Sequence, residues 1–251
     1  MLIKLLNFVV KFLMYLFLRP SENAEIEIHG SKEGQWAVPK RFFSENSTVI
    51  LAGAGCDISF DISLYQQYKL NMKIIDPTPR AQQHFDNVIA YLKGEDTTLD
   101  ITQRQMYRLK SGFLYNNIDF VPFGLWDSSG IIKFFLPKNI NDISLSARNI
   151  QRTKEFVELN VLTISDLIKK ANVDRIDFLK MDIEGAEYKV IDSMFNDGIY
   201  PTLLSIEFDE MSTNFFKTRW PITFLKYLKK IRKEYNIFYV DRKLNFTFIK
   251  K

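Results

Sequence analysis

Short apolar runs with strand character alternate with longer helical runs from residue 48 to the end of the chain, and this alternation restricts the fold more than any other feature. Parallel strands need crossover helices that cover both faces of their sheet, so the pattern predicts an α/β protein with a mostly parallel sheet. A C-terminal hairpin is expected to add an antiparallel strand. The predicted strands are residues 48–52, 72–75, 118–123, 176–180 and 203–208, with the hairpin at 237–240 and 246–249. The predicted helices are residues 60–70, 79–92, 184–195 and 221–233, with a short helix starting at Ser165 and Asp166.

The domain organisation follows from the length and the apolar content. A chain of 251 residues that is 46% hydrophobic can bury one substantial core. We therefore expect a single domain at residues 48–251, preceded by a lead-in segment at 20–47 that contains one short strand at 24–28. A run at 131–136 is expected to pair antiparallel with a neighbouring strand.

Charge and cysteine content exclude several classes of protein. The 34 basic and 30 acidic residues give a net charge of +4 and are scattered along the chain, which argues against nucleic acid as a partner. A single cysteine, Cys56, excludes an internal disulfide framework and fits a cytoplasmic protein. His29 and His84 lack metal-ligand spacing, so no metal site is predicted.

Residues 1–19 are apolar apart from a few polar positions. Lys4, Asn7 and Lys11 fall on one helical stripe, and apolar residues cover the rest of the circumference. The uninterrupted apolar run at 12–18 is far shorter than the roughly 20 residues that span a bilayer. We therefore expect a helix that lies at the inner face of the membrane or packs on a partner. A tilted anchor, a cleaved signal peptide and a helix packed on the protein's own core remain alternatives.

A glycine pair follows the first predicted strand. Gly53 and Gly55, with Ala54 between them, come directly after the apolar run and before a predicted helix. Glycine there allows a sharp turn and lets a ligand approach where a Cβ atom would collide. The third glycine of a dinucleotide fingerprint is absent, because Ile58 occupies its position, and this lowers the expectation of a pyrophosphate ligand. An ordinary tight turn would explain the two glycines equally well.

An acidic residue follows the second predicted strand. Asp76 lies 21 residues after Gly55 and directly before Pro77. A carboxylate at this strand end can accept hydrogen bonds from both ribose hydroxyls of an adenosine-containing ligand. The alternative is an Asp-Pro turn starter with no further role.

The most informative segment is the one at residues 176–187. A predicted strand delivers three carboxylates, Asp182, Glu184 and Glu187, to the sheet edge at which open α/β sheets bind their ligands. Helix capping explains part of this pattern, since an Asp is a fair N-cap and acidic residues suit a first turn. Capping does not explain Lys180 within an apolar strand. Gly185 in the predicted first turn indicates a close approach of the backbone to another group.

These motifs together resemble the FkbM family of methyltransferases. The similar segments are GAGCDISFD at 53–61, DPTPR at 76–80, FGLW at 123–126 and LKMDIEGAE at 179–187. The resemblance covers about residues 47–210. It implies a seven-stranded, mostly parallel Rossmann-like sheet with helices on both faces, and S-adenosylmethionine as the cofactor.

The resemblance also implies roles for individual residues. The glycine pair would hold the methionine end of the cofactor, Asp76 the ribose, and residues 124–125 the adenine, with Asp182 beside the sulfonium and the acceptor. Leu51 stands where most class I enzymes have an acidic residue, so Asp57 or Asp61 is expected to substitute. The implied cofactor-binding residues are Gly53, Ala54, Gly55, Asp57, Asp76, Pro77, Gly124, Leu125 and Asp182.

The expected reaction is methylation of a hydroxyl group on a sugar, glycan or small molecule, which is the substrate class that the resemblance implies. A hydroxyl acceptor needs a base, and the candidate catalytic carboxylates are Asp182 first, then Glu184, with Glu207 as a partner. A nicotinamide-dependent oxidoreductase and a catalytically inactive, membrane-associated binding protein remain alternatives. The sequence does not indicate the oligomeric state.

Overall fold

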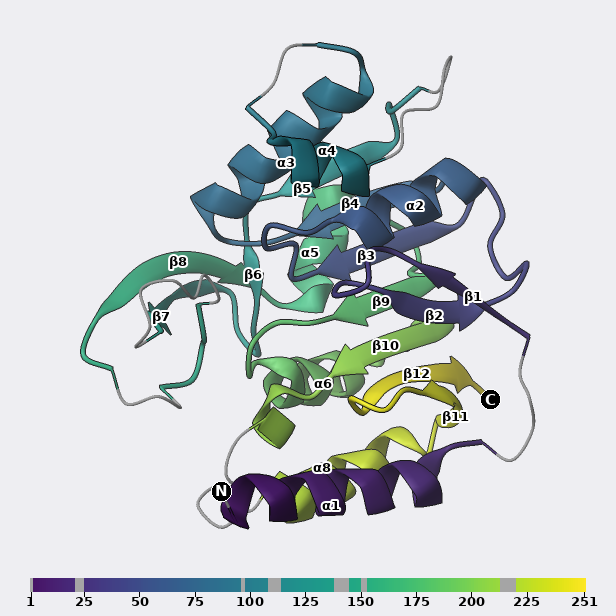
Figure 1. Ribbon diagram of the computed structural model, residues 1–251, viewed down its shortest axis with the longest axis vertical. Helices are drawn as coiled ribbons and strands as arrows, with labels where there is room; N and C mark the ends of the chain where they lie inside the picture. Colours follow the sequence, from purple (N-terminus) through teal and green to yellow (C-terminus); the bar gives the residue numbers. More distant parts are fainter. Residues whose placement is uncertain are drawn as a thin grey trace.

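The computed structural model describes residues 2–20, 25–95, 98–107, 114–137, 145–149, 153–212 and 220–251. Its largest element is a seven-stranded sheet with the strand order β11-β12-β10-β9-β3-β4-β5 (Figure 1). Strands β3, β4, β5, β9 and β10 pair in parallel, whereas β12 runs antiparallel to both β10 and β11. The sheet is therefore mixed rather than mostly parallel, because the C-terminal hairpin contributes both antiparallel pairings. The seven strands are β3 (Thr48–Ala52), β4 (Asn71–Ile75), β5 (Ile118–Val121), β9 (Phe178–Met181), β10 (Leu203–Glu207), β11 (Tyr235–Val240) and β12 (Asn245–Lys250).

Helices pack on both faces of this sheet. Side chains of β3 alternate between two buried clusters, with Ile50 and Ala52 in one and Val49 and Leu51 in the other. The first cluster includes side chains of α5, α6 and α8, and the second includes side chains of α2 and α3. The helices are α1 (Leu2–Leu18), α2 (Ser59–Tyr68), α3 (Pro79–Leu92), α4 (Ile101–Met106), α5 (Ile164–Ala171), α6 (Glu187–Asn196) and α8 (Trp220–Ile231), with a 3-10 helix η1 (Asp209–Ser212).

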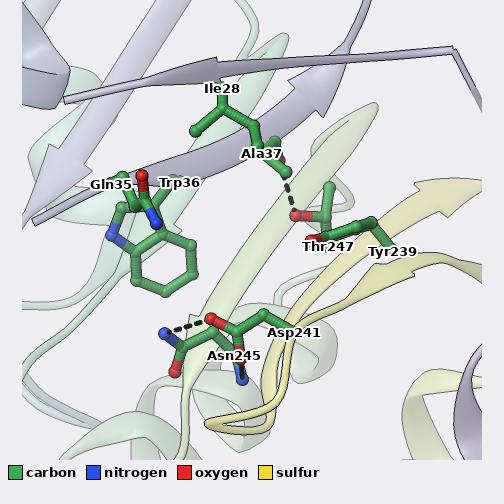
Figure 2. A pocket seen from close by; sticks show the side chains of 8 residues that line it. All are labelled: Ile28, Gln35, Trp36, Ala37, Tyr239, Asp241, Asn245 and Thr247. Carbon is green, nitrogen blue, oxygen red and sulfur yellow. Dashed lines mark hydrogen bonds between the residues drawn. The ribbon is translucent and has the colours of Figure 1, made fainter. Parts of the chain in front are cut away.

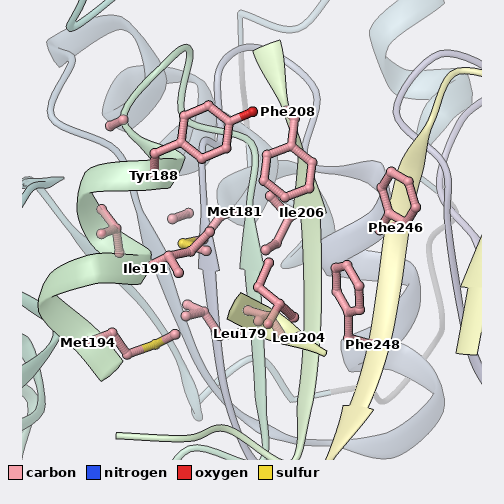
Figure 3. Packing of buried hydrophobic residues seen from close by; sticks show 14 of the residues in the cluster. Leu179, Met181, Tyr188, Ile191, Met194, Leu204, Ile206, Phe208, Phe246 and Phe248 are labelled. Carbon is pink, nitrogen blue, oxygen red and sulfur yellow. The ribbon is translucent and has the colours of Figure 1, made fainter. Parts of the chain in front are cut away.

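The core on the α6 side fixes the central strands. Leu179 and Met181 of β9 and Leu204 of β10 point toward Ile191 and Met194 of α6 (Figure 3). All five side chains are fully buried. Strands buried on both faces read as continuous apolar runs, which explains why the sequence pattern located them.

The segment at 20–47 contains a hairpin that the sequence pattern predicted only in part. Strands β1 (Ile26–His29) and β2 (Trp36–Pro39) pair antiparallel, and β2 is fully buried. The Thr247 hydroxyl of β12 donates to the Ala37 carbonyl at 3.0 Å, beside a small cavity of about 40 Å³ (Figure 2). The hairpin is thereby attached to β12 of the main sheet.

A second, three-stranded sheet has the order β6-β8-β7. Its strands are β6 (Gly124–Leu125), β7 (Gly130–Phe135) and β8 (Phe156–Leu162). The antiparallel pairing of β7 with β8 confirms the expectation for residues 131–136. The sequence pattern missed most of β8, because its side chains are largely exposed and give no apolar run.

The helix predicted at 184–195 begins later than expected. Its N-cap is Ala186, and the first helical residue is Glu187. Glu184 and Gly185 both have positive φ angles, of +54° and +98°, so they form a turn between β9 and α6. Asp182 therefore lies four residues before the N-cap and does not cap this helix, and the glycine serves the turn rather than the helix.

The N-terminal segment forms helix α1, which runs beside the β11–β12 hairpin near α8 (Figure 1). Within the residues that the structure describes, no helix has the length and apolar character needed to span a bilayer.

Candidate active site

A cavity of about 610 Å³ lies at the carboxyl ends of β3, β4 and β9. Glu207 does not line it. The cavity-lining residues that the sequence singled out are Gly53, Ala54, Gly55, Asp57, Asp61, Asp76, Pro77, Gly124, Leu125, Lys180, Asp182 and Glu184. Three strand ends and the β6 segment thus bring these separated residues to one site.

The two glycines meet different surroundings. A Cβ atom on Gly53 would lie 1.7 Å from the backbone oxygen of Asp182, so this glycine is required where β3 and β9 pack closely. A Cβ atom on Gly55 would have no atom within 4 Å. Both residues have positive φ angles, of +89° and +51°. Gly55 therefore presents bare backbone to open space, as expected for a ligand cradle.

Asp76 organises the glycine loop. One of its oxygens, Oδ2, accepts hydrogen bonds from the backbone N–H groups of Ala54 and Gly55, each at 3.1 Å. The other, Oδ1, accepts from the backbone N–H of Thr78 at 2.9 Å and from its hydroxyl at 2.6 Å. A carboxylate offers about four acceptor positions. A ligand hydroxyl can therefore bind Asp76 by replacing one of these donors.

Asp57 connects the glycine loop to the β1–β2 hairpin. Its carboxylate accepts a hydrogen bond from the Ser31 hydroxyl at 2.6 Å and another from the Ser59 backbone N–H at 2.9 Å. Glu33 and Gly34 of the hairpin also line the cavity. The hairpin therefore forms one wall of the cavity, which the sequence did not indicate.

Lys180 supplies a buried positive charge beside the cavity. It is 5% exposed, and its Nζ lies 3.8 Å from Oδ2 of Asp182 and 3.4 Å from the backbone oxygen of Gly53. The same Nζ lies 5.4 Å from the centre of the Trp36 ring. Burial raises the pKa of Asp61 to about 6, and the charge of Lys180 opposes that rise. The sequence indicated Lys180 as a candidate site residue, because a lysine is unusual within an apolar strand. It gave no indication that Trp36 lies at the site.

Further carboxylates lie around Asp182. Burial, together with the charges of Asp182 and Glu184, raises the pKa of Glu207 to about 7. Burial also raises the pKa of Asp209, with Asp182 adding to the effect and Arg148 opposing it. These acids hold protons more readily than exposed carboxyl groups do. Among the described residues, no three His, Cys, Asp or Glu side chains are arranged to hold a metal ion.

The turn after β9 places Glu184 at the cavity. The Ser146 hydroxyl donates to the Glu184 backbone oxygen at 2.7 Å. A Cβ atom on Gly185 would lie 3.3 Å from the Arg148 side chain, which forms an ion pair with Glu210. The segment at 145–149 therefore covers this turn.

The opposite wall of the cavity is apolar. Gly124 and Leu125 are both buried, and a Cβ atom on Gly124 would lie 3.0 Å from Val161 and 3.1 Å from Phe134. Phe134 and Leu159 line the same wall from β7 and β8. The cavity thus has a polar side at β3, β4 and β9 and an apolar side at the small sheet.

Glu187 is a buried acid whose raised pKa should make the stability of the protein depend on pH. It is 1% exposed, and one carboxylate oxygen accepts from the Gly185 N–H at 3.0 Å while the other, Oε2, has no hydrogen-bond partner among the described residues. Burial raises its pKa to about 8, well above the value of about 4.3 for an unfolded chain. The folded protein therefore holds this proton between about pH 5 and pH 8, and its free energy of unfolding should fall as the pH rises through that window.

Replacing Glu187 with Gln, which resembles the protonated acid, should remove this dependence. We expect Glu187→Gln to be more stable than the parent at pH 8 by roughly 2 to 5 kcal/mol and similar to it at pH 5. Urea unfolding at both pH values measures the effect. Glu95→Gln, at an exposed glutamate, is the matched control and should behave as the parent does. Parallel pH profiles for the parent and Glu187→Gln would contradict the assignment.

Comparison with known proteins identifies the family. A family model described as the methyltransferase FkbM domain matches residues 65–236, which is more than half of the chain. The matched region contains Asp76, Gly124, Asp182 and Glu207, but it begins after the glycine loop. No curated protein and no solved structure matches the chain. With the family model and the residues at the strand ends in agreement, the chain belongs to the FkbM methyltransferase family.

Proposed function

We propose that this methyltransferase transfers the methyl group of S-adenosylmethionine to a hydroxyl group of a sugar, glycan or small molecule. The observation that carries the proposal is the cavity at the ends of β3, β4 and β9. It gathers the glycine loop, Asp76 and Asp182 around one space. Its volume of about 610 Å³ falls within the range of roughly 300 to 1,000 Å³ that is typical of small-molecule sites.

The residues of the cavity fit the proposed cofactor. Gly55 offers bare backbone beside open space. The Asp76 carboxylate lies next to the loop, because it accepts hydrogen bonds from the backbone N–H groups of Ala54 and Gly55. Leu125 belongs to the apolar wall, which suits a flat aromatic base. We assign the loop at 53–55 to the methionine end, Asp76 to the ribose and residues 124–125, with Pro77, to the adenine. When bound, S-adenosylmethionine supplies a methyl group that is already activated by a sulfonium.

The carboxylates at the end of β9 supply the proton chemistry. A hydroxyl acceptor loses a proton as it is methylated, and a positioned base lowers the barrier. The Asp182 side chain is 35% exposed and lines the cavity, so it can accept a hydrogen bond from the hydroxyl. Lys180 at 3.8 Å holds this carboxylate in place. Glu207 can take up the proton near neutral pH, because its pKa is raised to about 7.

Direct binding of the cofactor tests the proposal. Isothermal titration of the purified protein with S-adenosylmethionine should give one site with a dissociation constant between about 1 µM and 1 mM, the usual range for enzyme ligands. NAD⁺ and NADH, titrated in the same buffer, should show no binding. Binding of a nicotinamide cofactor alone would support an oxidoreductase instead, and the absence of any binding would support an inactive binding protein.

The acceptor class is tested separately. Incubation with S-adenosylmethionine labelled in its methyl group, together with a panel of free sugars, glycans and small alcohols, should move the label into a base-stable ether. Label recovered as a base-labile ester or on an amine would contradict a hydroxyl acceptor.

A further inference from the structure

Over residues 6–18, the part of α1 whose side chains the structure describes, the exposed face is entirely apolar. Phe17 is 83% exposed and Phe8 is 66% exposed, whereas exposed side chains of this size in a protein usually occur singly. The seven exposed residues lie on one side of a helical wheel. They are Leu6, Phe8, Val9, Phe12, Leu13, Leu16 and Phe17.

The opposite face of α1, which contains the polar positions, packs against the protein. The Trp220 indole N–H donates to the side-chain oxygen of Asn7 at 3.3 Å. Lys11 is partly buried, and the charges of Glu207, Asp209 and Asp241 act on it. The side chain of Lys4 lies outside the described residues. Apolar residues of the same face, Val10, Met14, Tyr15 and Leu18, pack against the core.

These polar contacts fix the orientation of the helix. Rotating α1 to bury its apolar face would expose Val10 and Met14 and would remove the partner of Trp220, a fully buried residue. It would also separate Lys11 from the acids that face it, which is costly for partly buried charges. The apolar face is therefore directed outward by specific contacts, and it needs a separate apolar environment.

Positive charge lies on helix α8, which contacts α1. Helix α8 begins at Trp220, the residue that contacts α1, and its exposed side carries Lys226 and Lys229 together with two apolar residues, Ile222 and Leu225. Both helices lie at the same end of the molecule (Figure 1). An outward apolar helix face with exposed lysines on a neighbouring helix suits binding to an anionic lipid surface.

We propose that α1 docks the protein on an anionic membrane surface, with the helix lying in the plane of the interface. Its 17 residues rise about 26 Å at 1.5 Å per residue, short of the roughly 30 Å hydrocarbon core, so the helix rests on the bilayer and does not span it. The phenylalanines at positions 8, 12 and 17 enter the boundary between headgroups and acyl chains. The lysines of α8 contact lipid phosphates.

A lipid surface fits better than a second copy of the chain. Two copies that met through this face in a symmetric dimer would bring Lys226 and Lys229 of each copy toward the same interface. The like charges would repel one another, whereas anionic phosphates would neutralise them. The charge of the flanking residues therefore distinguishes the two occupants.

Vesicle co-sedimentation of the full chain tests the proposal. The parent should sediment with vesicles of equal parts phosphatidylglycerol and phosphatidylcholine, and weakly with phosphatidylcholine alone. Phe8→Ser/Phe17→Ser should weaken binding by about tenfold or more, because two large apolar side chains are lost from the buried face. Lys226→Gln/Lys229→Gln should weaken binding to the anionic vesicles by about fivefold or more and leave the phosphatidylcholine result unchanged.

The matched control is Ile101→Ser/Ile131→Ser, which removes two exposed apolar side chains, 76% and 67% exposed, from α4 and β7 at sites away from α1 (Figure 1). It should bind as the parent does. Each variant should unfold at the same midpoint temperature as the parent, which checks that it is folded. Equal binding by the parent and Phe8→Ser/Phe17→Ser would overturn the proposal. A parent that ignores vesicles but forms a dimer that Phe8→Ser/Phe17→Ser dissociates in gel filtration would assign the face to a second copy.

Discussion

Replacing Asp182 with Asn is expected to reduce methyl transfer by roughly a hundredfold to ten-thousandfold while cofactor affinity stays within about tenfold. The side chain lines the cavity and is 35% exposed, so it can reach an acceptor. Asn keeps the size of the side chain but cannot accept a proton. The substitution removes the charge that pairs with Lys180 and that raises the pKa values of Glu207 and Asp209, but it preserves the packing, so the fold should be retained.

Rates of methyl transfer and titrations with S-adenosylmethionine, made on the same preparations, separate the two effects. Asp127→Asn is the matched control: it removes an aspartate that pairs with Lys189 at 2.6 Å and does not line the cavity. The control should keep the parent rate. Full activity in Asp182→Asn would refute the role of this residue and move the search for the base to Glu184 and Glu207. Loss of cofactor binding together with the rate would instead indicate a structural role.

The central strands could be read from the sequence because burial on both faces makes them apolar at successive positions. Strands β3, β9 and β10 are largely of this kind, whereas β4 alternates, with Asn71 and Lys73 only partly buried. The site residues follow directly after β3, β4 and β9. Because parallel strands end at the same edge, finding the strands was enough to predict that Gly55, Asp76 and Asp182 lie near one another. The family model matches residues 65–236, so the match includes Asp76 and Asp182 but not the glycine loop.

The walls of the cavity could not be predicted in the same way. Strand β2 contributes Trp36 through a hairpin of only four residues per strand, and β8 has mostly exposed side chains, so neither gives a clear periodic signal. The position of Glu184 was also misjudged, because acids near a predicted helix start look like first-turn residues. Residues 184 and 185 both have positive φ angles, so they form a turn and not the start of the helix. In the sequence, Gly185 was the only indication of this turn.

For helix α1, the sequence predicted the helix but not which of its faces packs on the protein. Periodicity placed Asn7 and Lys11 on one stripe, and the structure has them on one face. The usual rule would turn the apolar side toward the core. Instead, Trp220 and the acids of the β10–η1 region hold the polar side of α1 against the protein. These partners lie about 200 residues away in the sequence. Only tertiary contacts decide which face of such a helix is exposed.

The two loop glycines are expected to fail in different ways when each is replaced by alanine. In Gly53→Ala the new methyl group would meet the Asp182 backbone oxygen at 1.7 Å, and backbone atoms cannot move aside as a flexible side chain can. We expect a loss of more than about 4 kcal/mol in the free energy of unfolding, or no folded protein. In Gly55→Ala the methyl group would enter open space, so only the positive φ angle is penalised, at about 1 to 2 kcal/mol.

The same substitution at Gly55 should nevertheless weaken binding of S-adenosylmethionine by about tenfold or more, because it fills the space in which the ligand would approach the backbone. Gly198→Ala is the matched control, since Gly198 also has a positive φ angle, of +71°, and no atom within 4 Å, but lies outside the cavity. Urea unfolding and cofactor titration of all three variants give the comparison. If Gly53→Ala were as stable as Gly198→Ala, the close packing of β3 on β9 would be wrong. If Gly55→Ala bound the cofactor as tightly as Gly198→Ala does, the open face of the loop would not be where the cofactor lies.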